Sequence, residues 1–171
     1  DAHLLSSLHK KGVKDPDNFF RPVDQYALNP KSVSVDELYG RYNELTQEWK
    51  NGIVATLVRQ TVESDGNGRR KWVVFDGPVD TLWIESMNTV LDDNKVLCLS
   101  SGERLNVSAD VHMVFEVLDL DQASPATVSR CGMVYMEPQQ LAWSSLTWAW
   151  LNKLPDQLQP YRGVLQTMFD K

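Results

Sequence analysis

The feature that most constrains the fold is a continuous apolar run, WVVF at residues 72–75, which leads directly into Asp76. Unbroken apolar runs of this length are typical of strands that are buried on both faces, as in a parallel sheet. Similar runs at 111–116 (VHMVFE) and 133–136 (MVYM) alternate with segments of helical pattern. Strands that alternate with helices predict an α/β domain, in which helices cover both faces of a mostly parallel sheet.

The intervening segments carry local signals for helices, turns and one hairpin. Ser34 and Glu37 have the spacing of a capping box, which is typical of a helix start. Ser101 and Gly102 lie between two short apolar segments, KVLCL and RLNV, as in a hairpin turn. The remaining expected elements are a helix that ends near Gly12, a strand at 23–28, two helical pieces up to Val62 with an inserted turn at 50–52, a helix over 81–91, a short helix within 124–132 and a helical tail after Pro138.

The chain divides by pattern into two parts. Residues 1–138 contain the alternation of strands and helices and are predicted to form a partial α/β subdomain. Residues 139–171 have a helical pattern and are predicted to connect it to a helical subdomain. The opening segment, DAHLLSSLHKKG, has the end of a helix without a comparable beginning, and its first residue is not methionine. We therefore expect the chain to be an excerpt of a longer polypeptide.

Composition narrows the classes of function. A net charge of -6 disfavours a general affinity for nucleic-acid phosphates or anionic membranes. The one basic cluster, Arg69-Arg70-Lys71, follows a turn-rich segment and is predicted to be a solvated loop edge. The two cysteines fit a reduced intracellular setting better than a disulfide scaffold. Because the sequence has no run of about 18 apolar residues, we predict neither a membrane span nor a membrane partner.

Asp76 and Gly77 end the apolar run with a pair of residues that bears on ATPase chemistry. In phosphate-binding ATPases an aspartate at the end of a buried strand helps to hold Mg²⁺, and a neighbouring acidic residue positions the attacking water. Gly77 cannot polarise water, and the phosphate loop G-x-x-x-x-G-K-[ST] is absent from the 171 residues. On pattern alone such an aspartate is more often the cap of a loop. Two interpretations remain: no nucleotide site, or a phosphate loop that precedes Asp1.

Arg130 is the other candidate for chemistry. It follows the strand at 111–116 within SPATVSRCG, where we expect the end of a short helix. An arginine at such a position can reach across a subunit boundary and stabilise the charge that develops during phosphoryl transfer. The alternative is an arginine that interacts with the dipole of its own helix end.

The histidines and cysteines give no comparable pattern. The histidines, at positions 3, 9 and 112, are scattered, and the cysteines lack C-x-x-C spacing, so a zinc site is not predicted. Cys131 would be a nucleophile only if His112 approached it, and a buried structural cysteine is the preferred interpretation.

Longer motifs identify a family. The run from WVVFDGPVD to GMVYMEP, residues 72–138, closely resembles the second AAA+ module of dynein heavy chains. Upstream, LNPKSVSVDELYG at 28–40 and ELTQEWKNGI at 44–53 are similar to the same module. The segment ASPATVSRCGMVYMEP resembles the axonemal branch more than the cytoplasmic one. The resemblance extends from about residue 20 to 154, which is nearly the whole chain.

The resemblance implies roles for four residues. In this family the second module has a Walker-B-like strand that ends in Asp-Gly, and it binds nucleotide without efficient hydrolysis. Asp76 then corresponds to the aspartate on the Mg²⁺ side of the nucleotide, and Gly77 accounts for slow turnover. Glu116 matches the sensor position, where an active module has asparagine. Arg130, in SRCG, matches the arginine finger that completes the main ATP site of the first module.

The resemblance also implies cofactors, partners and location for a full-length chain, which would be part of a motor ATPase. ATP or ADP with Mg²⁺ would occupy the pocket there, whereas the isolated segment is expected neither to hold nucleotide tightly nor to turn over ATP. The partners would be neighbouring AAA+ modules and the linker of the same heavy chain, with intermediate chains, light chains and microtubules bound through other regions. The location would be the cytoplasm and cytoskeleton, in the axoneme of a cilium or flagellum.

Three structural expectations complete the resemblance. The fold would be a P-loop NTPase (AAA+) sheet that lacks its first strand and phosphate loop. The strand at 133–136 would thereby lose a neighbour, which leaves open edges. Insertions near 43–53 and 97–107 would contact the moving linker, although on pattern alone either is as well explained as an ordinary surface loop.

Two alternatives to a catalytic motor segment stay open. One is a structural or interaction α/β module without nucleotide, in which the sheet and the insertions transmit motion and neither site does chemistry. The other is a stand-alone α/β binding domain unrelated to ATP, which would require a native chain that begins near Asp1.

Overall fold

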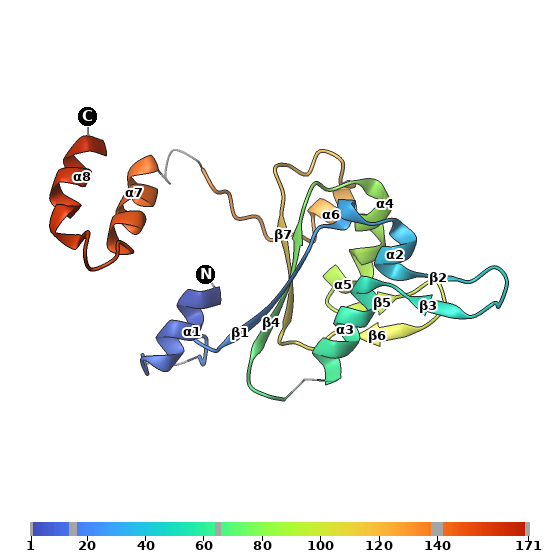
Figure 1. The fold of residues 1–171 in the computed structure, drawn as a ribbon. Helices are drawn as coiled ribbons and strands as arrows, with labels where there is room; N and C mark the ends of the chain where they lie inside the picture. The colour runs from blue at the N-terminus through green and yellow to red at the C-terminus, as the bar shows by residue number, and fades with distance from the viewer. Residues whose placement is uncertain (1, 14–16, 64–65, 138–141, 170–171) are drawn as a thin grey trace. The chain divides into compact units, whose positions relative to one another are not determined.

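The computed structural model describes residues 2–13, 17–63, 66–137 and 142–169 of the chain (Figure 1). The chain forms two compact units, Asp1–Cys131 and Gly132–Lys171. The boundary predicted between residues 138 and 139 lies outside the described residues. Among the residues that are described, no helix combines the length and the apolar character needed to cross a membrane.

A three-stranded parallel sheet forms the centre of the first unit. It pairs β1 (Val23–Leu28), β4 (Arg70–Asp76) and β7 (Val111–Glu116) in the order β1-β4-β7. The register sets Asp76 beside Glu116, so β4 and β7 end side by side. The predicted parallel sheet and these three strands are confirmed.

Helices lie on both sides of this sheet (Figure 1). On one side α1 (Ala2–Lys10) contacts β1. The elements on the other side are η1 (Pro30–Ser32), α2 (Val35–Tyr39), α3 (Ile53–Glu63), α4 (Thr81–Ile84), η2 (Glu85–Met87), α5 (Asn88–Leu91) and α6 (Pro125–Val128). The helix predicted over 81–91 is confirmed, although it is divided into α4, η2 and α5.

Two antiparallel hairpins complete the first unit. One pairs β2 (Gly40–Tyr42) with β3 (Trp49–Asn51), and the other pairs β5 (Val96–Cys98) with β6 (Arg104–Asn106). The second hairpin, with its turn at Ser101–Gly102, is as predicted.

The first hairpin corrects the prediction of two helical pieces. The capping box at Ser34 is present, yet α2 ends at Tyr39. Gly40 has a φ of 115°, a conformation that strains any residue with a side chain, and it ends the helix. Gly52 lies so close to the end of α2 that an added Cβ would be 2.4 Å from the Leu38 carbonyl oxygen. These two glycines let the hairpin close directly between α2 and α3.

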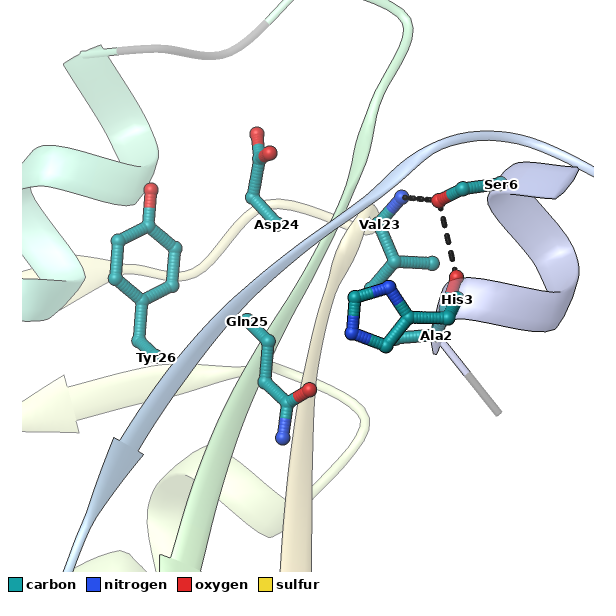
Figure 2. Close-up of a pocket in the computed structure, with 7 residues that line it drawn as sticks. All are labelled: Ala2, His3, Ser6, Val23, Asp24, Gln25 and Tyr26. Atoms are coloured by element: carbon teal, nitrogen blue, oxygen red, sulfur yellow. Dashed lines mark hydrogen bonds between the residues drawn. The ribbon is translucent and has the colours of Figure 1, made fainter. Parts of the chain in front are cut away.

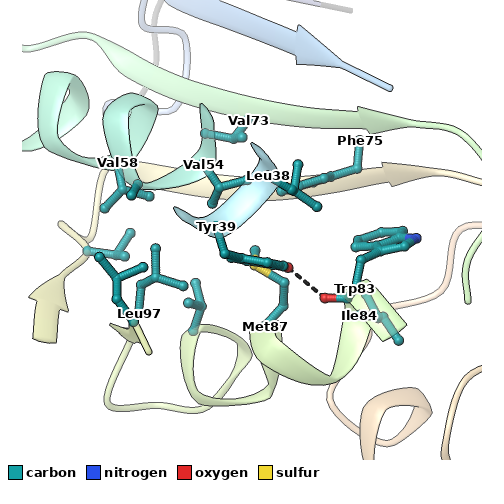
Figure 3. Packing of buried hydrophobic residues seen from close by; sticks show 14 of the residues in the cluster. Leu38, Tyr39, Val54, Val58, Val73, Phe75, Trp83, Ile84, Met87 and Leu97 are labelled. Atoms are coloured by element: carbon teal, nitrogen blue, oxygen red, sulfur yellow. Dashed lines mark hydrogen bonds between the residues drawn. The ribbon is translucent and has the colours of Figure 1, made fainter. Parts of the chain in front are cut away.

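The hydrophobic core lies between the sheet and the helices α2 to α5 (Figure 3). Its largest fully buried apolar side chains come from α2, α3, β4, α4, η2 and β5. They are Leu38, Val54, Val58, Val73, Phe75, Trp83, Ile84, Met87 and Leu97. Val74, on the opposite face of β4, is also only 2% exposed. The apolar run at 72–75 is therefore a strand with both faces covered, as its pattern predicted.

The basic cluster at 69–71 is not the solvated loop edge that we predicted. Lys71 is fully buried, and its Nζ donates a hydrogen bond to the Thr61 carbonyl oxygen at 2.6 Å. Arg69 binds Asp24 through Nε at 2.8 Å, which lowers the pKa of that carboxyl group. Arg70 stacks over the ring of Phe19, 4.5 Å from its centroid. β4 begins at Arg70, two residues before the apolar run, so Arg70 and Lys71 belong to the strand and Arg69 directly precedes it.

The second unit contains α7 (Trp143–Asn152), η3 (Gln159–Tyr161) and α8 (Arg162–Phe169). The helical character predicted for this part is confirmed. Trp150 on α7 packs edge-on against Phe169 on α8, with ring centroids 5.9 Å apart. Leu151 of α7 is fully buried.

The strand predicted at 133–136 is wrong. Residues 132–137 have no regular secondary structure, and the side chains at 133–136 are between 64% and 84% exposed. A strand needs a partner for its backbone N–H and C=O groups, and no described segment pairs with this one. The apolar pattern alone was therefore insufficient to form a strand here.

Candidate functional site

The ends of β4 and β7 bring two predicted site residues together. Asp76 and Glu116 are register partners on neighbouring parallel strands. Both are exposed, and within the described part of the chain neither side chain makes a hydrogen bond or an ion pair. Ligands bind at the carboxyl ends of strands in open α/β sheets. This edge presents two carboxylates to solvent on a backbone that the sheet holds in place.

Aromatic packing supports this edge from the core side. Phe75 precedes Asp76 and is fully buried. Its ring stacks on Trp83 with centroids 5.5 Å apart and planes 14° apart, and on Phe115 with centroids 5.2 Å apart. Phe115 in turn precedes Glu116. The residue before each carboxylate is therefore anchored in one aromatic stack.

Gly77, which directly follows Asp76, has no free space for a side chain. A Cβ added at Gly77 would be 2.7 Å from Asn29 Oδ1 and 3.3 Å from Pro30 Cδ. Asn29 cannot swing away freely, because its Oδ1 accepts a hydrogen bond from the Lys31 amide at 2.9 Å. Gly77 thus does more than omit a carboxylate: the neighbouring loop leaves no room for a larger residue.

The segment after Gly77 is tied to the same loop. The Asp80 side chain caps α4 by accepting a hydrogen bond from the Trp83 amide at 3.1 Å, and it also forms an ion pair with Lys31. Partial burial opposes ionisation of Asp80, but the bonds from Lys31 and the Trp83 amide lower its pKa overall. Tyr39 Oη donates to the Trp83 carbonyl oxygen at 2.6 Å, and burial raises the pKa of this tyrosine. These contacts fix the turn on which Gly77 lies.

The carboxylates suit Mg²⁺ only in part. Mg²⁺ prefers oxygen ligands and usually keeps several waters, so one or two carboxylates and substrate phosphates are enough to hold it. Among the described residues, no group of three or more His, Cys, Asp or Glu converges on one point. Asp76 and Glu116 therefore fit an ion that a nucleotide brings with it, and not a closed site built from protein ligands.

Arg130 lies two residues beyond α6, at the helix end where the sequence predicted it. Its Nε forms an ion pair with Asp92, and its Nη1 donates to the Ala126 carbonyl oxygen at 2.7 Å. The guanidinium contacts neither Asp76 nor Glu116 within the part of the chain that the structure describes. Arg130 is thus held apart from the strand-end carboxylates of its own unit.

Cys131 shows the features of a structural cysteine. Its Sγ donates a weak hydrogen bond to the Thr127 carbonyl oxygen at 3.3 Å, and burial raises its pKa. A raised pKa disfavours the thiolate that a nucleophile needs. His112 is half-buried in β7, and burial lowers its pKa.

One pocket lies elsewhere, between α1 and β1 (Figure 2). It has a volume of about 400 Å³ and is lined by Ala2, His3, Ser6, Val23, Asp24, Gln25 and Tyr26. Ser6 joins its two walls, because its Oγ donates to the Ala2 carbonyl oxygen and accepts from the Val23 amide. None of the predicted site residues lines this pocket, so the chemistry predicted from the sequence does not belong to it.

Comparison with known proteins fits this geometry. The family described as "AAA domain (dynein-related subfamily)" matches residues 21–131, and the match ends with the last residue of the first unit. The chain belongs to the dynein-related subfamily of AAA domains. This assignment agrees with the α/β fold and with the family that the sequence motifs resemble.

Similar segments occur in axonemal dyneins. The chain is 54% identical to human "Dynein axonemal heavy chain 12" over 170 residues, which are 98% of this chain and 5% of that protein. It is 49% identical to human "Dynein axonemal heavy chain 6" over 164 residues, 94% of this chain and 4% of that protein. Mouse "Dynein axonemal heavy chain 1" is 51% identical over 153 residues, 89% of this chain and 4% of that protein. The chain thus spans a small fraction of the length of these relatives.

For a member of this AAA subfamily, the structure adds contacts that sequence reasoning missed. Asn29, which closes the space around Gly77, follows the strand predicted at 23–28 and was given no role by the sequence. Asp92, the partner of Arg130, lies in the segment LDDNK, which has the composition of an ordinary turn. Neither has a local sequence signal, because each contact joins segments that are distant in the chain.

Proposed function

We propose that this AAA domain is the second module of an axonemal dynein motor ring, which binds nucleotide without efficient hydrolysis and supplies an arginine finger to the main ATP site of the neighbouring module. The observation that carries the proposal is the placement of Arg130. It is partly exposed at the end of α6, and its contacts are to Asp92 and Ala126, away from the carboxylates of its own unit. Such an arginine is available to a nucleotide on another module.

The strand-end residues support slow turnover at the module's own site. Asp76 would hold Mg²⁺ together with the nucleotide phosphates, and Glu116 lies beside it. When bound, the metal would neutralise charge on the phosphates. Gly77 offers no carboxylate to position water, and the loop at Asn29 excludes a side chain there. The pocket would therefore retain ATP or ADP as a structural ligand in a full-length chain.

The proposed setting is a microtubule-based motor in the cytoskeleton of a cilium or flagellum. Its partners would be the adjacent AAA+ modules and the linker of the same heavy chain, with intermediate chains, light chains and microtubules bound elsewhere. The high identity to segments of axonemal heavy chains supports this setting. The isolated segment is not proposed to turn over ATP.

The test is the substitution Arg130→Ala in a full-length heavy chain. Loss of an arginine finger in phosphoryl transfer reduces turnover by about 10³–10⁵-fold, so ATPase activity and microtubule gliding are expected to fall by orders of magnitude. Arg162→Ala, which removes a half-buried cation from α8, serves as the control and is expected to leave turnover unchanged. Unchanged turnover of the Arg130→Ala motor would refute the finger role.

A structural module without its own chemistry is the second candidate. The hairpin β2–β3 favours it, because Leu45 at its tip is 94% exposed and Tyr42 is 47% exposed, which suits contact with a moving segment such as the linker. In this case Arg130→Ala would leave hydrolysis intact, whereas Leu45→Asp would uncouple hydrolysis from gliding.

A further inference from the structure

Arg130 is fixed at two points by its own unit. Its Nε forms an ion pair with Asp92, and its Nη1 donates to the Ala126 carbonyl oxygen at 2.7 Å. The backbone amide of Arg130 also donates to the Thr127 carbonyl oxygen at 3.1 Å, which continues the last turn of α6. The backbone of Arg130 and two of its guanidinium nitrogens, Nε and Nη1, are therefore held by contacts within the unit.

Asp92 is itself placed by the end of α5. Its amide donates to the Asn88 carbonyl oxygen at 3.2 Å, so it lies one turn beyond Asn88 on the same helical face. Asn88 Oδ1 accepts a hydrogen bond from Thr127 Oγ1 at 2.9 Å, and Thr127 is fully buried. The pairs Asn88–Thr127 and Asp92–Arg130 thus join α5 to the end of α6 at two successive turns.

The contacts of Arg130 leave part of its guanidinium available. The group carries five N–H donors, of which Nε and one on Nη1 are used within the unit. Nη2 makes no hydrogen bond to any residue that the structure describes. The Arg130 side chain is 32% exposed. Nη2 and the second Nη1 donor form a fork that matches phosphate oxygens.

We infer that Asp92 is the positioning residue of Arg130: it holds Nε so that the free Nη donors face a nucleotide phosphate of the neighbouring module. This inference rests on the finger role proposed above. An ion pair this exposed adds little to stability, so its effect lies in orientation. An arginine released from Asp92 samples many rotamers, and a catalytic group that is not held in place loses rate.

The experiment is Asp92→Asn in the full-length heavy chain, with steady-state ATP turnover measured against ATP concentration. We expect kcat to fall about ten-fold while the KM for ATP stays unchanged, because the finger acts on charge that develops in the transition state. Asp92→Glu, which keeps the carboxylate, is expected to recover part of the loss. Asp93→Asn removes the same charge from the adjacent exposed residue and is expected to have no effect.

A second measurement repeats Asp92→Asn in the Arg130→Ala background. If Asp92 acts through Arg130, the second substitution causes no further loss of kcat. A further ten-fold loss would overturn the inference, since Asp92 would then act through the fold. A rise in kcat for Asp92→Asn alone would also overturn it, because Asp92 would then restrain the finger. If Arg130→Ala itself leaves kcat unchanged, both the finger role and the inference that rests on it are refuted.

Discussion

The strand-end site (Asp76, Gly77 and Glu116) and the α5–α6 pair that carries Arg130 are built in different ways. At the strand ends the backbone is fixed by sheet register and aromatic packing, while the two carboxylates remain without a partner among the described residues. At the α5–α6 pair the helices are single turns. There, polar side-chain contacts join the two helices and hold the guanidinium group of Arg130 itself.

The two regions therefore depend on a bound ligand to different degrees. The carboxylates of the strand-end site need a ligand to define their positions, because nothing in the described chain binds them. Arg130 has its position before any ligand arrives, because Asp92 and Ala126 hold it. Under the proposed function, nucleotide would complete the strand-end site, whereas Arg130 would act, already ordered, at the active site of another module.

The largest loss of stability is expected from Phe75→Ala, next to the strand-end site. Phe75 is fully buried and contacts both Trp83 and Phe115, so its loss leaves a cavity below the ends of β4 and β7. The free energy of unfolding, measured by urea denaturation of the 171-residue chain, is expected to fall by about 3–5 kcal/mol. Phe75→Leu, as the control, is expected to cost less. A loss below about 1 kcal/mol for the alanine variant would show that apolar packing does not hold this region.

Gly77→Ala tests the tight space behind Asp76. The new Cβ would be 2.7 Å from Asn29 Oδ1, and overpacking of this kind costs about 1–3 kcal/mol. Gly132→Ala is the matched control, because no atom lies within 4 Å of the Cβ it would add. In an Asn29→Ala background, Gly77→Ala is expected to cost much less than in the wild type, because the overlap with Oδ1 is gone. Equal stability of the two single glycine variants would contradict the steric role of Asn29.

Thr127→Val probes the polar joint between α5 and α6. The substitution keeps the side-chain shape but removes the hydrogen bond to the half-buried Asn88, which costs about 0.5–1.5 kcal/mol. Thermal unfolding of Thr167→Val, an exposed threonine on α8, provides the comparison and is expected to show little change. A Thr127→Val chain as stable as the wild type would mean that apolar contacts, and not this bond, join the two helices.

The smallest effect concerns Asp80 and pH. The folded-state pKa of Asp80 is lowered, so its contribution to stability is present above the unfolded pKa of about 3.9 and is lost as the pH falls through the folded value. Asp80→Asn retains a capping side chain but loses the ion pair with Lys31, at a cost of about 0.5–1 kcal/mol at neutral pH. The free energy of unfolding, measured by denaturation at pH values from 6 to 2, is expected to fall less steeply with decreasing pH for the variant than for the wild type. Parallel curves would contradict this role of Asp80.

Several features of the fold and the site were predictable because their signals are local. The run at 72–75 predicts a buried strand by composition alone, and the strand places Asp76 at its end. The hairpin at Ser101–Gly102 and the helix end before Arg130 likewise follow from turn and capping residues. The roles of Asp76, Gly77, Glu116 and Arg130 remain predictions, since they came from resemblance to a family.

Two of the errors have the same physical cause: the structure of the segment depends on a partner that lies outside it. Lys71 is charged, yet it is buried because its ammonium group donates a hydrogen bond to the Thr61 carbonyl oxygen, ten residues away, and no local pattern shows this partner. Residues 133–136 have the composition of a strand, but a strand forms only where another strand binds its edge.

The family, the α/β core and the three strands of its parallel sheet could be predicted from the sequence alone. Local composition, turn residues and long motifs carry that information. The contacts between distant segments, such as Asn29 against Gly77 and Asp92 with Arg130, became visible only in the folded chain. Such contacts depend on which surfaces meet after folding, because hydrogen bonds, ion pairs and close packing act over a few ångströms in space and not along the chain.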